Sequence, residues 1–174
     1  MESNPPTWNP EDNTSSLRQY AAWLNDQARA SLLRDGTHAD LWFLLQENGE
    51  GQLIPTPPDM DKDDLAAALK ETIEQAQVYG VIHIAEVWGY FPRDANDHTA
   101  KQIMDGEIPV SGLKDSDKTE ALMVQMESRD GDGYLWISPI VRENGGTTLA
   151  EASEVSGLTQ GRFTGLFSHE SRLP

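Results

Sequence analysis

The segment from Thr119 to Glu143 constrains the fold most, because its pattern is typical of a β-hairpin. The stretch TEALMVQMESRDGDGYLWISPIVRE contains two strand-like runs joined by an Asp/Gly turn at Asp130–Gly133. Strands joined by so short a turn are antiparallel neighbours. The sequence therefore predicts an antiparallel sheet in the second half of the chain.

Two helices and three more strands are expected before this hairpin. The runs 15–36 and 59–80 carry apolar residues at helical spacing, and each run ends at a glycine. Residues 38–58 read as a strand, a polar turn and a short second strand, and 81–91 reads as one buried strand. Residues 92–118 are polar and rich in Gly, Asp and Pro, so we expect a long loop whose middle forms a short helix.

The resulting order, α-β-β-α-β-loop-β-β, predicts an α+β domain. We expect one mostly antiparallel sheet of about five strands with two main helices on one face. Strand residues 41–45 and 134–141 are apolar on both faces, which two helices can hardly cover. We expect the C-terminal segment to cover part of the second face; otherwise that face is a surface for a homodimer or a partner protein.

The domain boundaries follow from composition. Residues 1–14 contain three prolines and few apolar residues, which predicts a disordered N-terminal arm whose Trp8 makes a local contact or docks on the domain or a partner. Residues 15–167 form the single α+β domain, and residues 168–174 form a loose C-terminal tail. No apolar run approaches the roughly 18 residues of a membrane span. We expect a cytoplasmic protein that does not bind membranes.

The acidic composition limits the classes of partner that the protein is expected to bind. With 29 Asp and Glu against 13 Lys and Arg, the formal net charge is −16. Such a surface repels phosphate backbones, so direct nucleic-acid binding is not expected. There is no cysteine, and no phosphate loop, G-x-G-x-x-G or H-E-x-x-H motif occurs. We therefore expect no cofactor, and the sequence predicts no metal site.

Two carboxylates lie on the apolar face of predicted strands. Side chains alternate between the two faces of a strand, so Glu86 points to the same face as Ile82 and Ile84. For the same reason, Glu120 points to the same face as Leu122. If these two strands are antiparallel neighbours, the end of the first lies beside the start of the second, which brings Glu86 and Glu120 together.

Further ionisable groups are expected at the same end of the sheet. The terminal hairpin returns Arg142 there, and a right-handed crossover places the strand that begins at His38 and Asp40 there too. One interpretation is a structural ion pair between Arg142 and a glutamate. The other is a site, either a ligand pocket or paired carboxylates that share a proton or bind a hard cation.

The site hypothesis assigns roles to six residues. The catalytic candidates are Glu86, Glu120 and His38, and the ligand-binding candidates are Asp40, Trp88 and Arg142. If the site is catalytic, the protein is a hydrolase or a metal-dependent enzyme.

Three stretches carry a resemblance. They are EVW at Glu86–Trp88, KTEALMVQMESRDG, which begins at Lys118, and the upstream DGTHADLWFLL. Together they resemble a set of small bacterial and phage α+β proteins of unknown function, over the region from the first helix to Arg142. The resemblance implies a fold pattern that includes the strand carboxylates, and it implies no activity.

The sequence thus favours a small, acidic, cytoplasmic binding or regulatory module for a protein or small ligand, from phage or mobile-element biology. The alternative is the hydrolase or metal-dependent enzyme centred on Glu86 and Glu120.

Overall fold

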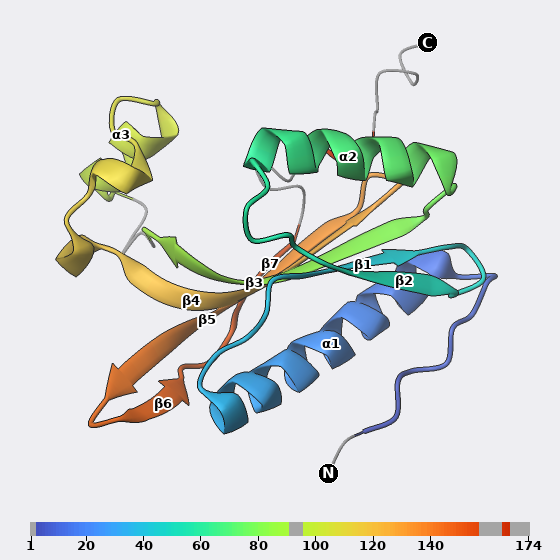
Figure 1. Ribbon diagram of the computed structural model, residues 1–174, viewed down its shortest axis with the longest axis horizontal. Helices are drawn as coiled ribbons and strands as arrows, with labels where there is room; N and C mark the ends of the chain where they lie inside the picture. The colour runs from blue at the N-terminus through green and yellow to red at the C-terminus, as the bar shows by residue number, and fades with distance from the viewer. Residues whose placement is uncertain (1–2, 91–95, 157–164, 168–174) are drawn as a thin grey trace.

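A computed structural model describes residues 3–90, 96–156 and 165–167 (Figure 1). Its helices are α1 (Asn13–Asp35), α2 (Lys62–Gln75) and α3 (His98–Met104), with 3-10 turns at Val110–Gly112 and Asp115–Asp117. Its strands are β1 (Leu41–Leu45), β2 (Gly51–Pro55), β3 (Gly80–Gly89), β4 (Thr119–Ser128), β5 (Gly133–Glu143), β6 (Gly146–Leu149) and β7 (Ser153–Ser156). The fold is α+β, as the sequence predicts.

The seven strands within the described residues join one antiparallel sheet in the order β2-β1-β3-β4-β5-β6, and β7 also pairs with β5. The sheet has seven strands rather than about five, because the two short strands β6 and β7 extend it beyond β5. The predicted hairpin is β4–β5, with Ala121 opposite Pro139 and Glu127 opposite Gly133. The neighbouring strands β3 and β4 pair over their full lengths, from Gly80 opposite Ser128 to Gly89 opposite Thr119.

The first helix packs on one face of the sheet. Asp12 caps its start by accepting a hydrogen bond from the backbone N–H of Ser15, and Gly36 ends it with φ 77°. Its apolar side chains are buried against alternate residues of β3, β4 and β5, among them Ile82, Leu122 and Trp136. This is the larger of the two hydrophobic clusters.

The second helix lies on the opposite face, so the prediction of both helices on one face is wrong (Figure 1). Its buried residues Leu65, Leu69 and Ile73 contact a cluster that contains Leu44 and Val81. The neighbouring residues Leu45 and Ile82 belong to the α1 cluster, because successive side chains on a strand point to opposite faces. Both faces of these strands are apolar because α1 packs on one face and α2 packs on the other.

The C-terminal segment covers part of the α2 face, as expected from the sequence. Leu166 and Phe167 are buried in the α2 cluster. The predicted tail, residues 168–174, lies outside the described residues.

The N-terminal segment, expected as a disordered arm, contacts the domain through Trp8. The Trp8 Nε1–H donates to Asn13 Oδ1 at 2.9 Å and to the carbonyl oxygen of Glu47 at 2.7 Å. Its ring lies against Gly49 in the turn between β1 and β2, where an added Cβ would come within 2.5 Å of Trp8 Cγ. In the structure, Trp8 therefore docks on the domain.

The long segment before β4 forms a separate lobe at one end of the sheet (Figure 1). This α3 lobe, residues 96–118, contains α3 and both 3-10 turns, and none of its residues is buried. The expected short helix within the loop is thus α3. In the part of the chain that the structure describes, no helix is long and apolar enough to cross a membrane.

Candidate functional site

The sheet register brings the two predicted carboxylates together. Glu86 is opposite Leu122, and Trp88 is opposite Glu120 on the neighbouring strand. Since residues two apart on a strand share a face, Glu86, Trp88 and Glu120 all lie on the α1 face, at the end of β3 and the start of β4. The antiparallel β5 then returns Arg142 to the same end.

Arg142 links both carboxylates. Its Nε–H and Nη2–H donate to the two oxygens of Glu120, each at 2.9 Å, and Nη2 also donates to Glu86 Oε2 at 2.9 Å. Its Nη1 donates to the carbonyl oxygen of Gly36 and, at 3.2 Å, to Thr147 Oγ1. All five guanidinium N–H groups therefore have an acceptor.

The second oxygen of Glu86 is also occupied. Glu86 Oε1 accepts hydrogen bonds from Thr37 Oγ1 at 2.8 Å and from the backbone N–H of His38. We call Glu86, Glu120 and Arg142 the Arg142 cluster. It joins β3, β4 and β5 to β6 and to the loop that follows α1.

Within the cluster, the electrostatics favour the ionised forms of Glu120 and Arg142. The hydrogen bonds from Arg142 lower the pKa of Glu120; partial burial opposes this, and the charge of Arg142 reinforces it. The same pairing raises the pKa of Arg142. The Glu86 and Glu120 side chains are 19% and 14% exposed, so the pairing is partly shielded from water.

His38 and Asp40, the two site candidates that precede β1, lie in different places. His38 reaches the cluster through its backbone N–H, while its ring Nδ1 lies 2.6 Å from the carbonyl oxygen of Ala39. Asp40 is not in the cluster. Its Oδ1 lies 2.7 Å from His83 Nε2 and accepts a hydrogen bond from Thr56 Oγ1 at 2.6 Å.

Asp40 lies at the expected end of the sheet, since it directly precedes Leu41, which is opposite Ile84, but it is not part of the Arg142 cluster. Asp40 bonds instead with His83, a buried residue whose ring stacks on Trp42 with centroids 3.7 Å apart and an interplanar angle of 7°. Burial raises the pKa of Asp40, but the hydrogen bonds from His83 and Thr56 together outweigh this and lower it.

Sequence reasoning missed the His83–Asp40 pair. The signal that could have found it is the β1–β3 register, in which Trp42 is opposite His83 and Asp40 directly precedes the paired residues. That register depends on contacts between distant parts of the chain.

The Arg142 cluster borders an open hollow. Trp88 is 60% exposed and lies at its edge. The hollow has a volume of about 480 Å³ and is lined by Trp88, Lys118, Thr119, Glu120, Ile140 and Arg142. We call it the Trp88 hollow. Lys118 is paired with Asp115, at 3.4 Å from Nζ to Oδ1.

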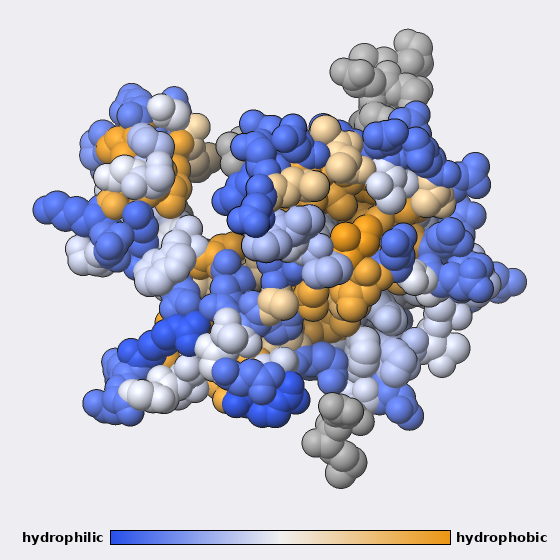
Figure 2. Space-filling model, viewed as in Figure 1, coloured by the Kyte–Doolittle hydropathy of each residue, from blue (hydrophilic) through white to orange (hydrophobic). Residues whose placement is uncertain are grey.

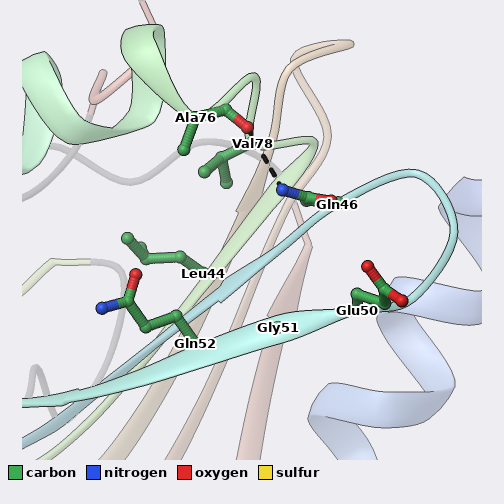
Figure 3. A pocket seen from close by; sticks show the side chains of 7 residues that line it. All are labelled: Leu44, Gln46, Glu50, Gly51, Gln52, Ala76 and Val78. Carbon is green, nitrogen blue, oxygen red and sulfur yellow. Dashed lines mark hydrogen bonds between the residues drawn. The ribbon is translucent and has the colours of Figure 1, made fainter.

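A smaller hollow of about 200 Å³ lies between the β1–β2 hairpin and the end of α2 (Figure 3). It is lined by Leu44, Gln46, Glu50, Gly51, Gln52, Ala76 and Val78. Gln46 Nε2 donates across it to the carbonyl oxygen of Ala76 at 3.5 Å (Figure 3). Apolar residues gather around this region below α2 (Figure 2). None of the sequence candidates lies here.

The described residues contain no group of three or more His, Cys, Asp or Glu that could hold a metal ion. The arrangement at Arg142 is suited to fixing chain segments, and the exposed indole beside it is suited to contact with a partner.

Comparisons with known proteins give a match to a protein family. The model of a family described as bacteriophage lambda protein ea47 matches residues 4–169, nearly the whole chain. No curated protein and no solved structure gives a significant match.

Proposed function

We propose that this chain, which belongs to the family of bacteriophage lambda protein ea47, is a non-catalytic binding module that recognises a basic segment of a partner protein at the Trp88 hollow. The family is consistent with the phage proteins that the sequence resembles. On the sequence grounds given above, we propose that the module acts in the cytoplasm.

The observation that carries the proposal is the exposure of Trp88. A tryptophan that is 60% exposed leaves a large aromatic surface in water at the edge of a concave site. Tryptophan is among the residues that contribute most to binding when a partner covers them. The Arg142 cluster holds the floor of the hollow in place, so little ordering is needed on binding.

The charge of the molecule supports a basic partner. A net charge of −16 attracts cationic segments and speeds their association. At the hollow, a Lys or Arg of the partner can lie over the Trp88 ring in a cation–π contact. The two cationic side chains that line the hollow, Lys118 and Arg142, are each paired with carboxylates.

The alternative, a hydrolase that uses Glu86 and Glu120, is less well supported. A carboxyl group that moves a proton near neutral pH needs a pKa raised towards that range. Arg142 lowers the pKa of Glu120 instead. The oxygens of both glutamates also already accept hydrogen bonds within the protein.

Calorimetric titration with an Arg-rich peptide of extended conformation tests the proposal. We expect Trp88→Ala to weaken binding roughly tenfold, with Trp88→Phe intermediate because phenylalanine keeps a weaker ring. Leu53→Ala is the matched control, since Leu53 is 53% exposed on the distant edge strand β2. Equal binding by the Trp88→Ala and Leu53→Ala variants would show attraction by overall charge alone and refute the proposal.

A further inference from the structure

The strand β2 forms one end of the sheet, and within the described residues no strand pairs with its outer side (Figure 1). Four of its five residues, GQLIP, are exposed, and none of the five is charged. Leu53 in the middle of the strand is 53% exposed. Edge strands are commonly protected from pairing with another chain by charged side chains, so an uncharged and exposed edge is suited to such pairing.

The other end of the sheet differs from this edge. It is divided between β6 and β7, which have four residues each and pair with different parts of β5. Glu154 also puts a charge in β7. The longer template without a charged residue is therefore β2.

The hydrogen bonds of the β1–β2 hairpin determine which backbone groups of β2 point outward. The N–H of Gln46 donates to the carbonyl oxygen of Glu50 at 2.8 Å. At the other end of the hairpin, the N–H of Thr56 donates to the carbonyl oxygen of Asp40 at 2.9 Å. Hydrogen-bonded positions recur at every second residue of an antiparallel pair, so the residues between them direct their backbone groups away from β1. These outward residues are Gly51, Leu53 and Pro55.

We propose that β2 pairs with β2 of a second copy of this chain, antiparallel and about a two-fold axis at Leu53. In this register each Leu53 lies opposite the Leu53 of the other copy, and each Gly51 lies opposite a Pro55. Each Leu53 N–H then donates to the opposite Leu53 carbonyl oxygen, and each Gly51 N–H donates to the opposite Pro55 carbonyl oxygen. Both outward N–H groups of each copy thus have an acceptor. Proline has no N–H, so only the Gly51 carbonyl oxygen is left to water.

A second copy is favoured as the occupant because the edge is self-complementary. Its outward residues supply donors and acceptors at matching positions when the strand is turned about its own centre. The two exposed Leu53 side chains then meet across the axis on the same face of the sheet. Just beyond the strand, Glu50 lies opposite Thr56 of the other copy, so the register sets no like charges opposite each other.

The neighbouring register is less favourable. An axis at Gln52 would place Pro55 opposite Gly49 of the other copy. Gly49 lies in the turn, with φ +80° and against the Trp8 ring, so it does not extend a strand pair. The axis at Leu53 keeps all five residues of both strands in the pair. No residue of β2 lines the Trp88 hollow, so this inference goes beyond the proposed function.

Cysteine crosslinking tests the register, because the chain has no cysteine of its own. Opposed residues at a hydrogen-bonded position have Cα atoms about 5.5 Å apart, within the range of a disulfide. We expect Leu53→Cys to form disulfide-linked dimers under mild oxidation roughly tenfold faster than Leu33→Cys. Leu33 is the matched control, since it is 50% exposed on α1. Gln52→Cys should also be slow, because Gln52 lies opposite Ile54 of the other copy and not opposite itself.

Sedimentation of the unmodified chain tests the dimer without a crosslink. A contact of this size is at the weak end of protein interfaces, so we expect a dissociation constant of roughly 0.1 mM. Leu53→Lys should weaken the dimer roughly tenfold, because it places two like charges opposite each other. Leu33→Lys changes the net charge equally and should leave the dimer intact. The Leu53 side chain is exposed, so thermal melts should show a folded variant.

Four results would overturn the proposal. Equal crosslinking rates for Leu53→Cys and Leu33→Cys would show random collision, and faster crosslinking at Gln52 would move the axis away from Leu53. A chain that stays monomeric at about 1 mM would exclude a dimer of the expected strength. A dimer that Leu53→Lys does not weaken would have its contact elsewhere on the molecule.

Discussion

Arg142 explains how two carboxylates are held on an otherwise apolar sheet face. An unpaired carboxylate at 14–19% exposure would be strongly destabilising, but every guanidinium N–H has an acceptor and both glutamates bind the same cation. Alternation and strand direction were enough to predict that Glu86, Glu120 and Arg142 meet. The contacts from Gly36, His38 and Thr147 could not be predicted, because they depend on the exact path of two loops.

The pH dependence of stability tests the role of Glu120. Because its pKa is lowered in the folded protein, its contribution is present above the unfolded pKa of about 4.3 and is lost as the pH falls through the lower folded value. We expect Glu120→Gln to reduce the free energy of unfolding at pH 7 by about 1–3 kcal/mol. The difference from the wild type should shrink towards pH 3.

Urea unfolding followed by circular dichroism at a series of pH values measures this. Glu107→Gln, an exposed position on the α3 lobe, controls for the loss of one negative charge. A difference between wild type and Glu120→Gln that stays constant with pH would mean that the Arg142 pairing does not act through ionisation.

At the level of elements, the β1–β2 turn and the N-terminal segment stabilise each other. Gly49 has φ +80°, and a Cβ added to it would come within 2.5 Å of Trp8 Cγ. Gly49→Ala should therefore combine a backbone penalty with a steric clash, and we expect a loss of about 2–3 kcal/mol. Gly106→Ala is a matched control, since Gly106 has φ +74° with nothing within 4 Å of the added Cβ, and should lose only about 1 kcal/mol.

A double-mutant cycle with Trp8→Gly separates the two contributions to the Gly49→Ala loss, because only glycine removes both Trp8 Cγ and Trp8 Cβ, which lie 2.5 and 2.7 Å from the added Cβ. In the Trp8→Gly background, the loss should fall to that of Gly106→Ala, as measured by urea unfolding. An unchanged loss would contradict the contact between Trp8 and the turn.

The order of elements was predictable because each has a local signal: helical spacing in α1 and α2, and the Asp/Gly turn between β4 and β5. The side of the sheet on which α2 packs was not predictable in this way. Leu44 and Leu45 are equally apolar, yet one contacts α2 and the other α1. Which face a helix covers depends on how the chain crosses the sheet, and no local pattern records it.

At the scale of the whole molecule, self-repulsion should dominate the response to salt. Most of the charge behind the net −16 is on exposed residues, where salt screens it within about 8–10 Å, while the partly buried Arg142 cluster is screened less. Adding NaCl from about 20 to about 300 mM should therefore raise the melting temperature at pH 7, by roughly 2–5 °C.

Replacing the exposed carboxylates Glu71, Glu74 and Glu107 with Gln should raise the melting temperature at low salt and make it depend less on salt. Differential scanning calorimetry of both proteins measures the two slopes. A melting temperature that falls with salt would instead mean that the ion pairs contribute more than the repulsion, and the Arg142 cluster would then be the first candidate for that effect.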